Sequence, residues 1–242
     1  MEDLLEVIVR IDNKEFLKCN YIQLVSNSRT SLRTVIFKNI KLINKDVNLL
    51  SGEYDFCVAY KNQKLERKEV HWFDMYMIFS DMFTRDINDG DDIEIKSIMT
   101  HDKHIFYQQD VIDIYNLWQH NKEVNWNEID TDFKYSYVSA CFYWSKTPSK
   151  FINYEIVIDC LMIKEQIDLF YYLGREMFGE RAYCGSGFYQ FEDCISMLRA
   201  KGLQKLTLVI FRNFNQLESE SIINDINHLI TFFKSIKIEV QF

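Results

Sequence analysis

The sequence predicts an α+β protein with two differently built parts. Short runs of β-branched and aromatic residues between polar turns fill the first part, which is typical of a mostly antiparallel β domain. Strand-like and helix-like segments alternate in the second part, which is typical of a parallel sheet covered by helices. The single proline, Pro148, lies between them among small polar and basic residues. We therefore expect a β-rich domain over 1–146 and an α/β domain over 150–242.

Strands are expected in the first part wherever an apolar run ends at a polar turn. These runs are 5–11, 34–37, 54–60 and 92–95, and a last strand is expected over 133–144. A helix is expected over 109–119, because Val111, Ile114, Tyr115 and Trp118 recur at helical spacing. The dense apolar stretch 72–79 is interpreted as a core strand rather than an interaction surface, since large apolar residues are usually buried.

The second part alternates between segments with the two-residue period of a strand and segments with the 3.6-residue period of a helix. Strand-like runs cover 154–159, 206–211 and 236–242, and apolar stripes at helical spacing lie within 164–178, 188–198 and 222–233. The run 206–211 is apolar on both faces, as in a strand covered by helices. The order strand, helix, helix, strand, helix, strand implies parallel pairing with right-handed crossovers. We expect a small α/β layer with three parallel strands.

Composition excludes several classes of protein. The chain has 242 residues, 48% hydrophobic and 26% charged, which is a globular composition rather than a disordered one. No apolar run reaches the ~20 residues of a membrane span, and the acidic start of the chain does not resemble a signal peptide. We therefore expect a cytoplasmic protein. A net charge of -8 disfavours direct contact with nucleic acid and favours a basic protein partner.

The cysteines and histidines indicate no metal or other cofactor. Six cysteines, at positions 19, 57, 141, 160, 184 and 194, include no CxxC pair. Without a secretion signal we expect them to be reduced and mostly buried. His101 and His104 have a spacing that zinc sites use, but no third or fourth ligand accompanies them. We interpret them as solvated loop residues.

One segment of the second part carries a family resemblance. It reads Tyr183-Cys184-Gly185-Ser186-Gly187-Phe188-Tyr189-Gln190-Phe191-Glu192-Asp193-Cys194-Ile195. This is similar to the signature of the barstar family, intracellular inhibitors of secreted ribonucleases, in which an aromatic pair, a glycine and a polar turn precede a helix ending in Trp-Asp-Cys-Leu. Tyr183, Gly185, Asp193, Cys194 and Ile195 match this pattern without gaps. The neighbouring strands and helices also resemble the family's, so the resemblance covers 150–242.

Two positions depart from the family pattern. Tyr189 stands where the family's helix carries one of its two signature aspartates, and Glu192 stands where it carries tryptophan. A glutamate that some of these inhibitors use from a later helix has only a loose counterpart, Asp225. The first domain lies outside the resemblance.

The resemblance implies an inhibitor of the immunity or antitoxin type rather than an enzyme. Its partner would be a basic ribonuclease or a related toxin protein, whose cationic active site an acidic helix blocks. The implied partner-binding residues are Tyr183, Gly185, Gly187, Tyr189, Glu192, Asp193 and Ser196. The spacing agrees with this role, because positions 189 and 193 are neighbours on the helix face opposite the apolar stripe. A carboxylate on a rigid helix can replace a phosphate and bind Arg or Lys, and the two glycines let the turn approach a partner closely.

Three other interpretations stay open. The first is a protein-binding module of the same fold with a non-nuclease partner, which the tyrosine at position 189 favours. The second is an enzyme with Cys184 or Cys194 as nucleophile and His228 as base, although no spacing pairs them. The third is a phosphate site at Gly185-Ser186-Gly187, which lacks both the GxGxxG pattern and a following lysine.

Overall fold

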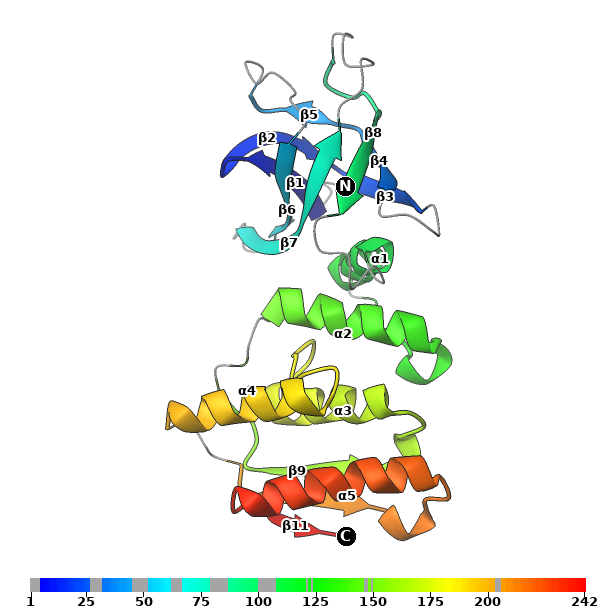
Figure 1. The fold of residues 1–242 in the computed structure, drawn as a ribbon, viewed down its shortest axis with the longest axis vertical. Helices are drawn as coiled ribbons and strands as arrows, with labels where there is room; N and C mark the ends of the chain where they lie inside the picture. Colours follow the sequence, from blue (N-terminus) through cyan, green and yellow to red (C-terminus); the bar gives the residue numbers. More distant parts are fainter. Residues whose placement is uncertain are drawn as a thin grey trace. The chain divides into compact units, whose positions relative to one another are not determined.

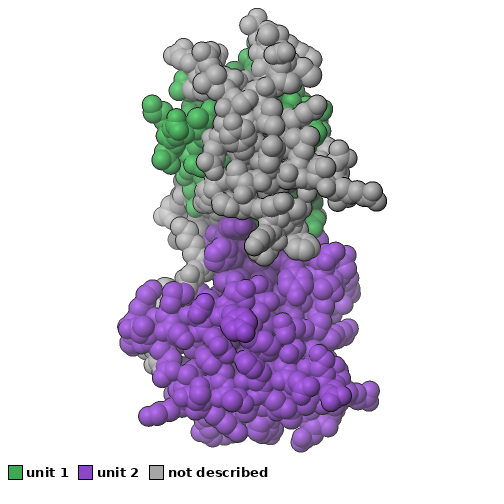
Figure 2. Space-filling model, in the orientation of Figure 1, with its two compact units in different colours: residues 1–124 green, residues 125–242 purple. Residues whose placement is uncertain are grey.

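The computed structural model divides into two compact units, residues 1–124 and 125–242 (Figure 1; Figure 2). The described residues are 5–26, 32–44, 52–61, 67–78, 87–99, 108–120, 122, 124–145, 148, 150–202 and 206–242. An antiparallel sheet in the first unit and a three-stranded parallel sheet with helices in the second confirm the predicted α+β class.

The first unit is built on one antiparallel sheet. Its strands are β1 (Leu5–Ile11), β2 (Lys14–Cys19), β3 (Tyr21–Ser26), β4 (Leu32–Lys38), β5 (Lys41–Leu42), β6 (Gly52–Lys61), β7 (Arg67–Ile78) and β8 (Ile93–Met99). They lie in the order β3-β4-β8-β7-β6-β1-β2-β5. The four runs predicted as strands before residue 100 all form strands. β7 covers most of the run 72–79, but the side chains of that run lie outside the described residues, so their burial stays a prediction.

Helix α1 (Gln108–Gln119) forms where the apolar periodicity predicts it. Val111, Ile114, Tyr115 and Trp118 are all buried. The Tyr21 hydroxyl of β3 donates to a carboxylate oxygen of Asp113 over 3.1 Å, which ties the helix to the sheet of its own unit.

The second unit contains the predicted parallel sheet. Its elements are η2 (Trp126–Glu128), α2 (Thr131–Ser145), β9 (Glu155–Asp159), η3 (Cys160–Met162), α3 (Gln166–Phe178), α4 (Phe188–Ala200), β10 (Leu208–Arg212), η4 (Phe214–Gln216), α5 (Glu220–Ser235) and β11 (Glu239–Gln241). β10 lies between β9 and β11 and is parallel to both. The helical stripes and the first two strand-like runs predicted after residue 150 are confirmed. The last run, 236–242, forms a strand only over Glu239–Gln241, because Ile236 ends helix α5.

The parallel sheet buries one face. Ile156, Ile158, Val209 and Phe211 are at most 2% exposed, whereas Val157, between two buried neighbours, is 37% exposed. Strands that lie in chain order and are joined by right-handed crossovers place every crossover helix on the same face of the sheet. This topology explains why α3, α4 and α5 cover one face.

The strand predicted over 133–144 is wrong, because these residues belong to helix α2. The carboxylate of Asp130 accepts the backbone N–H of Phe133 over 2.8 Å and so caps the start of the helix. Lys134, Tyr137, Val138 and Cys141 are buried at helical spacing. The aromatic and β-branched residues of this segment favour a strand, but packing against neighbouring elements outweighs that preference.

The boundary between the units lies earlier than the sequence predicts. It falls at 124/125 rather than near 147, so residues 125–145 belong to the second unit. The physical reason is that α2 packs on α3 and forms ion pairs with it. Pro148, expected in a linker, is buried.

Candidate functional site

Helix α4 presents a polar ridge to solvent. Its stripe Phe191, Ile195 and Leu198 is buried, whereas Tyr189 is 84% exposed and Asp193 and Ser196 are exposed. At 3.6 residues per turn, positions 189, 193 and 196 fall along one line of the helix surface. We call these three residues the α4 ridge. Within the described part of the chain, no hydrogen bond or ion pair engages their side chains.

One flank of the α4 ridge meets helix α5. Glu192 is half-buried, and its Oε1 lies 3.1 Å from Nε2 of His228, a distance at which the ring N–H donates to the carboxylate. The ring of His228 also packs against Phe188, with 4.4 Å between ring centroids. Glu192 is therefore held in place beside the ridge by a residue that the sequence interpretation used only as a candidate base.

The loop 183–187, which leads into α4, meets the end of α2. The backbone N–H of Tyr183 donates to the Ser145 hydroxyl over 3.1 Å, and the Tyr183 ring lies against Phe142 with 4.8 Å between centroids. Burial is the main cause that raises the pKa of Tyr183 to about 12, with nearby Cys194 and Cys184 adding to it and a hydrogen bond with Ser186 opposing it. Tyr183 thus joins the end of α2 to the loop that precedes α4.

The glycines of the predicted site serve the protein's own packing. Gly185 is buried and has φ +122°, a conformation that favours glycine. A Cβ at this position would lie 2.6 Å from the backbone N of Phe191, so only glycine lets the loop lie against the first turn of α4. Gly187 precedes the helix in extended backbone. Of the predicted partner-binding residues, the structure brings Tyr189, Glu192, Asp193 and Ser196 to the surface and places Tyr183 and Gly187 at its half-buried border.

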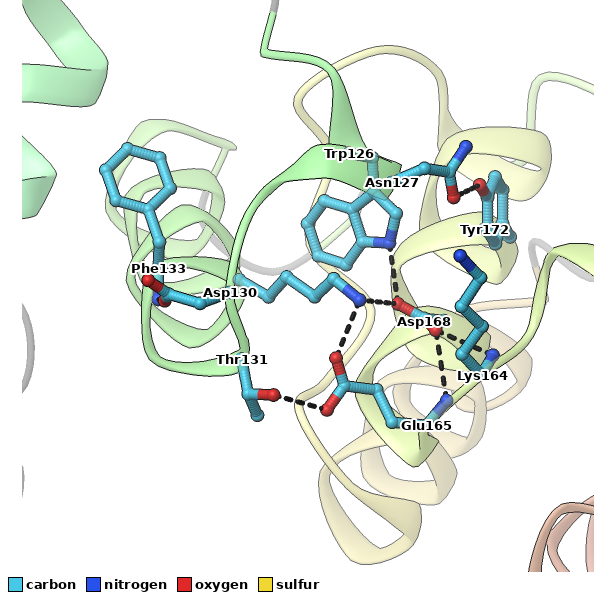
Figure 3. Close-up of polar contacts among 10 residues, drawn as sticks. Trp126, Asn127, Asp130, Thr131, Phe133, Lys164, Glu165, Asp168 and Tyr172 are labelled. Atoms are coloured by element: carbon cyan, nitrogen blue, oxygen red, sulfur yellow. Dashed lines mark hydrogen bonds and ion pairs between the residues drawn. The ribbon is translucent and has the colours of Figure 1, made fainter.

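A buried ionic cluster, which the sequence interpretation missed, joins α2 and η2 to the start of α3 (Figure 3). Lys134 Nζ donates to Asp168 over 2.7 Å and to Glu165 over 2.6 Å. The same oxygen of Asp168 accepts the indole N–H of Trp126 over 2.7 Å. The other oxygen accepts the backbone N–H groups of Lys164 and Glu165. The Thr131 hydroxyl donates to the second oxygen of Glu165 over 2.8 Å. These six donor contacts converge on two carboxylates, and we call the side chains of Trp126, Lys134, Glu165 and Asp168 the Lys134 cluster.

The Lys134 cluster is a structural device. The side chains of Lys134 and Asp168 are 7% and 1% exposed, so no substrate reaches them. Burial alone would lower the pKa of Lys134, but the hydrogen bonds to Asp168 and Glu165 outweigh it and raise the pKa above its ordinary value. The sequence holds one signal for this cluster: Lys134 lies on the same helix face as Tyr137, Val138 and Cys141. A cation on an apolar helix face needs a buried partner.

The cysteines lack the environment of a reactive nucleophile. All six are free and buried, as predicted. Burial raises the pKa of Cys194 to about 11 and that of Cys184 well above its usual range, which disfavours the thiolate that reacts. The Cys184 thiol donates to the backbone carbonyl of Phe170. His228, the candidate base of the enzyme interpretation, is paired with Glu192.

Two features are absent from the described residues. No group of three or more His, Cys, Asp or Glu residues there is arranged to hold a metal ion. His101 and His104 lie outside these residues. No helix in the same part of the chain combines the length and the apolar character that crossing a membrane requires.

Comparison of the chain with protein-family models, with curated proteins and with solved structures found no match.

Proposed function

We propose that the protein is a stoichiometric inhibitor of the barstar type, which protects the cytoplasm of its own cell by blocking a basic ribonuclease or related toxin. The observation that carries the proposal is the α4 ridge. Asp193 occupies the position that matches the family's acid, is exposed, and has no hydrogen bond or ion pair within the described residues. A carboxylate held on a rigid helix without an internal partner is available to another molecule.

The proposed mechanism is electrostatic substitution. A ribonuclease site binds phosphates and is therefore concave and cationic. The Asp193 carboxylate would enter it in place of a phosphate and accept charge-assisted hydrogen bonds from Arg or Lys. Glu192, held by His228, would add a second negative charge beside it. Binding of this kind needs no cofactor and no reaction on the inhibitor.

The arrangement of the unit supports the same proposal. A two-layer unit with a three-stranded parallel sheet and helices on one face is what the resemblance implies for 150–242. The loop that precedes α4 is fixed by Gly185 against Phe191 and by Ser145 against Tyr183. A surface that is rigid before binding loses little conformational entropy when it binds.

A second candidate is a binding module of the same fold with a non-nuclease partner. Tyr189 favours it, because a ring that is 84% exposed takes the place of a signature aspartate. Such a ring adds contact area to an interface without adding charge.

The test is a titration of basic secreted ribonucleases, each with a fluorogenic RNA substrate, by the intact chain. We expect at least one enzyme of the panel to lose its activity at an equimolar ratio and to elute with the chain in size-exclusion chromatography. A matched titration with Asp193→Ala should inhibit that enzyme at least tens of fold more weakly. If every enzyme of the panel stays active and none elutes with the chain, the inhibitor proposal is wrong. Capture of a basic protein without ribonuclease activity, lost in Asp193→Ala, would instead support the second candidate.

A further inference from the structure

We propose that the C-terminal half of α2 forms the second side of the partner-binding surface, and that its aromatic side chains bind arginine side chains of a basic protein partner. The inference rests on the proposed function, because it names which groups of that partner the surface takes. Residues 125–145 lie outside the family resemblance, so the resemblance does not imply this contribution.

The first support is that α2 is fixed to the rest of its unit at both ends. Near its start, Lys134 is buried between Asp168 and Glu165 of α3. At its end, the Ser145 hydroxyl accepts the backbone N–H of Tyr183 over 3.1 Å. In Figure 1, α2 and α5 lie on opposite sides of α4 within the second unit. The end of α2 therefore lies rigidly beside the loop that leads into the α4 ridge.

The second support is a ring contact that links α2 to the loop before α4, together with an exposed ring on α4 itself. Phe142 is 42% exposed, and its ring meets the half-buried ring of Tyr183 edge to face, at 4.8 Å between centroids. Tyr189 follows at the start of α4 with 84% exposure. We call Phe142, Tyr183 and Tyr189 the aromatic rim. Large aromatic side chains exposed beside charged groups are typical of residues that contribute most to protein binding.

The third support is the chemistry that the rim and the acids offer together. A guanidinium group binds a carboxylate in two parallel hydrogen bonds and stacks on an aromatic face at the same time. An ammonium group can lie over a ring and pair with a carboxylate, as Lys134 does with Trp126 and Asp168. It has no planar fork, so it neither forms two parallel hydrogen bonds nor stacks its plane on a ring.

A guanidinium group near both aromatic rings and a carboxylate occurs within the same unit. Arg175 lies 5.0 Å from the ring centroid of Tyr172 and 5.8 Å from that of Tyr171, and two of its nitrogens donate to one oxygen of Glu176. Asp193 is an exposed carboxylate, and Phe142 and Tyr189 are exposed rings, on the α2 and α4 helices of this unit.

The negative charge of the chain indicates which kind of molecule binds this surface. The chain carries a net charge of -8, so a second copy would bring like charges to this surface, and nucleic acid would bring phosphates. A protein surface rich in arginine is complementary to both the acids and the rings. We therefore commit to an arginine-bearing protein.

The test compares two labelled peptides of equal charge, fluorescein-labelled nona-arginine and nona-lysine, titrated with the intact chain at low salt and followed by fluorescence anisotropy. We expect tighter binding of the arginine peptide. Phe142→Ala and Phe142→Leu should each reduce the preference for arginine by about two- to fivefold, the range for one exposed cation–π contact. Leucine keeps apolar contact without an aromatic face, so an equal effect of both variants assigns the preference to the ring.

Tyr135→Ala is the matched control. Tyr135 is 38% exposed on the same helix and lies two turns before Phe142, about 10 Å away along the axis. This variant should keep the arginine preference of the parent, and thermal melts of all variants should agree. Equal binding of the two peptides by the parent, or an equal loss of preference in Tyr135→Ala, would overturn the inference. So would a dimer in sedimentation velocity that Phe142→Ala dissociates, because the surface would then bind a second copy.

The outcome separates this inference from the proposed function. Ribonuclease inhibition that Phe142→Ala leaves unchanged would refute the role of α2 and keep the inhibitor proposal. An arginine preference that depends on Phe142, with no ribonuclease inhibited, would keep the surface and refute its assignment to a nuclease.

Discussion

Asp168 and Asp193 are aspartates on successive helices of one unit, and they are used in opposite ways. Asp168 is 1% exposed and accepts hydrogen bonds from Lys134, Trp126 and two backbone N–H groups. Asp193 is exposed, and no hydrogen bond or ion pair engages it within the described residues. The difference separates a charge that organises the fold from a charge available to a partner. Residue type and family pattern alone do not make this distinction.

We expect the largest loss of stability when the partners of Asp168 are removed altogether. A fragment of residues 150–242 lacks Lys134 and Trp126 and leaves Asp168 and Glu165 without their cation. We expect residues 125–242 to melt cooperatively and the fragment 150–242 to melt without cooperativity and to bind the dye ANS. Thermal melts of both fragments check this. Equal cooperative melts would place the boundary near 147 after all and would make α2 dispensable for the fold.

A single substitution makes the same point. Asp168→Ala leaves Lys134 without its fully buried partner, and breaking a buried pair in this way costs about 3–5 kcal/mol. Asp193→Ala, the control of identical chemistry on α4, should change the free energy of unfolding by less than about 0.5 kcal/mol, because the site is exposed. Urea unfolding of both variants gives the difference. Similar losses in the two variants would mean that Asp193 also has a structural role.

The same contrast between a buried and an exposed position can be tested on the backbone, with two glycines that have positive φ. Gly185→Ala introduces a Cβ 2.6 Å from the backbone N of Phe191, so the loop or the first turn of α4 must move. We expect a loss of about 1–3 kcal/mol, the range for local backbone strain. Gly202→Ala, with φ +68° and open space around the Cβ, should lose only about 1 kcal/mol. Urea unfolding checks the ranking, and a larger loss at Gly202 would contradict this account of the loop.

The smallest expected effect is a change in the pH dependence of stability when Tyr183 is replaced by phenylalanine. Its pKa of about 12 in the folded protein exceeds the ordinary value of 10.0, so the folded state favours the neutral phenol. Its contribution to stability is fully present below about pH 10 and is lost as pH rises through the folded pKa. Tyr183→Phe should therefore lose less stability than the parent between about pH 9 and about pH 11.5. Melting temperatures at both pH values test this, and parallel losses would mean that Tyr183 titrates as in the unfolded chain.

Much of the architecture can be predicted from the sequence, because periodicity depends on which side chains face the core. The stripes of α3, α4 and α5 and the alternation along β9 follow directly from this rule. Helix α2 could not be predicted in the same way, since its aromatic and β-branched residues fit a strand locally and only its burial against α3 selects the helix. The earlier boundary follows from the same error.

The candidate site too could be predicted from the sequence only where it depends on local spacing. The spacing of Tyr189, Asp193 and Ser196 places them on one face, and the structure agrees. The pairing of Glu192 with His228, and the position of Phe142 beside Tyr183, join residues far apart in the chain. Local spacing carries no information about such contacts. Gly185 was interpreted as a partner-facing glycine, whereas the Cβ it lacks would point at its own helix.

The central claim is that Asp193 is the charge offered to a basic partner. The most direct measurement is the association of the intact chain with the ribonuclease it inhibits, for the parent and for Asp193→Ala, at about 50 mM and about 500 mM salt, because salt screens opposite charges that steer an encounter. We predict that the parent's association rate falls as salt rises. Asp193→Ala should bind at least tens of fold more weakly with unchanged thermal stability. An Asp193→Ala variant that binds like the parent, or that melts much earlier, would contradict the account.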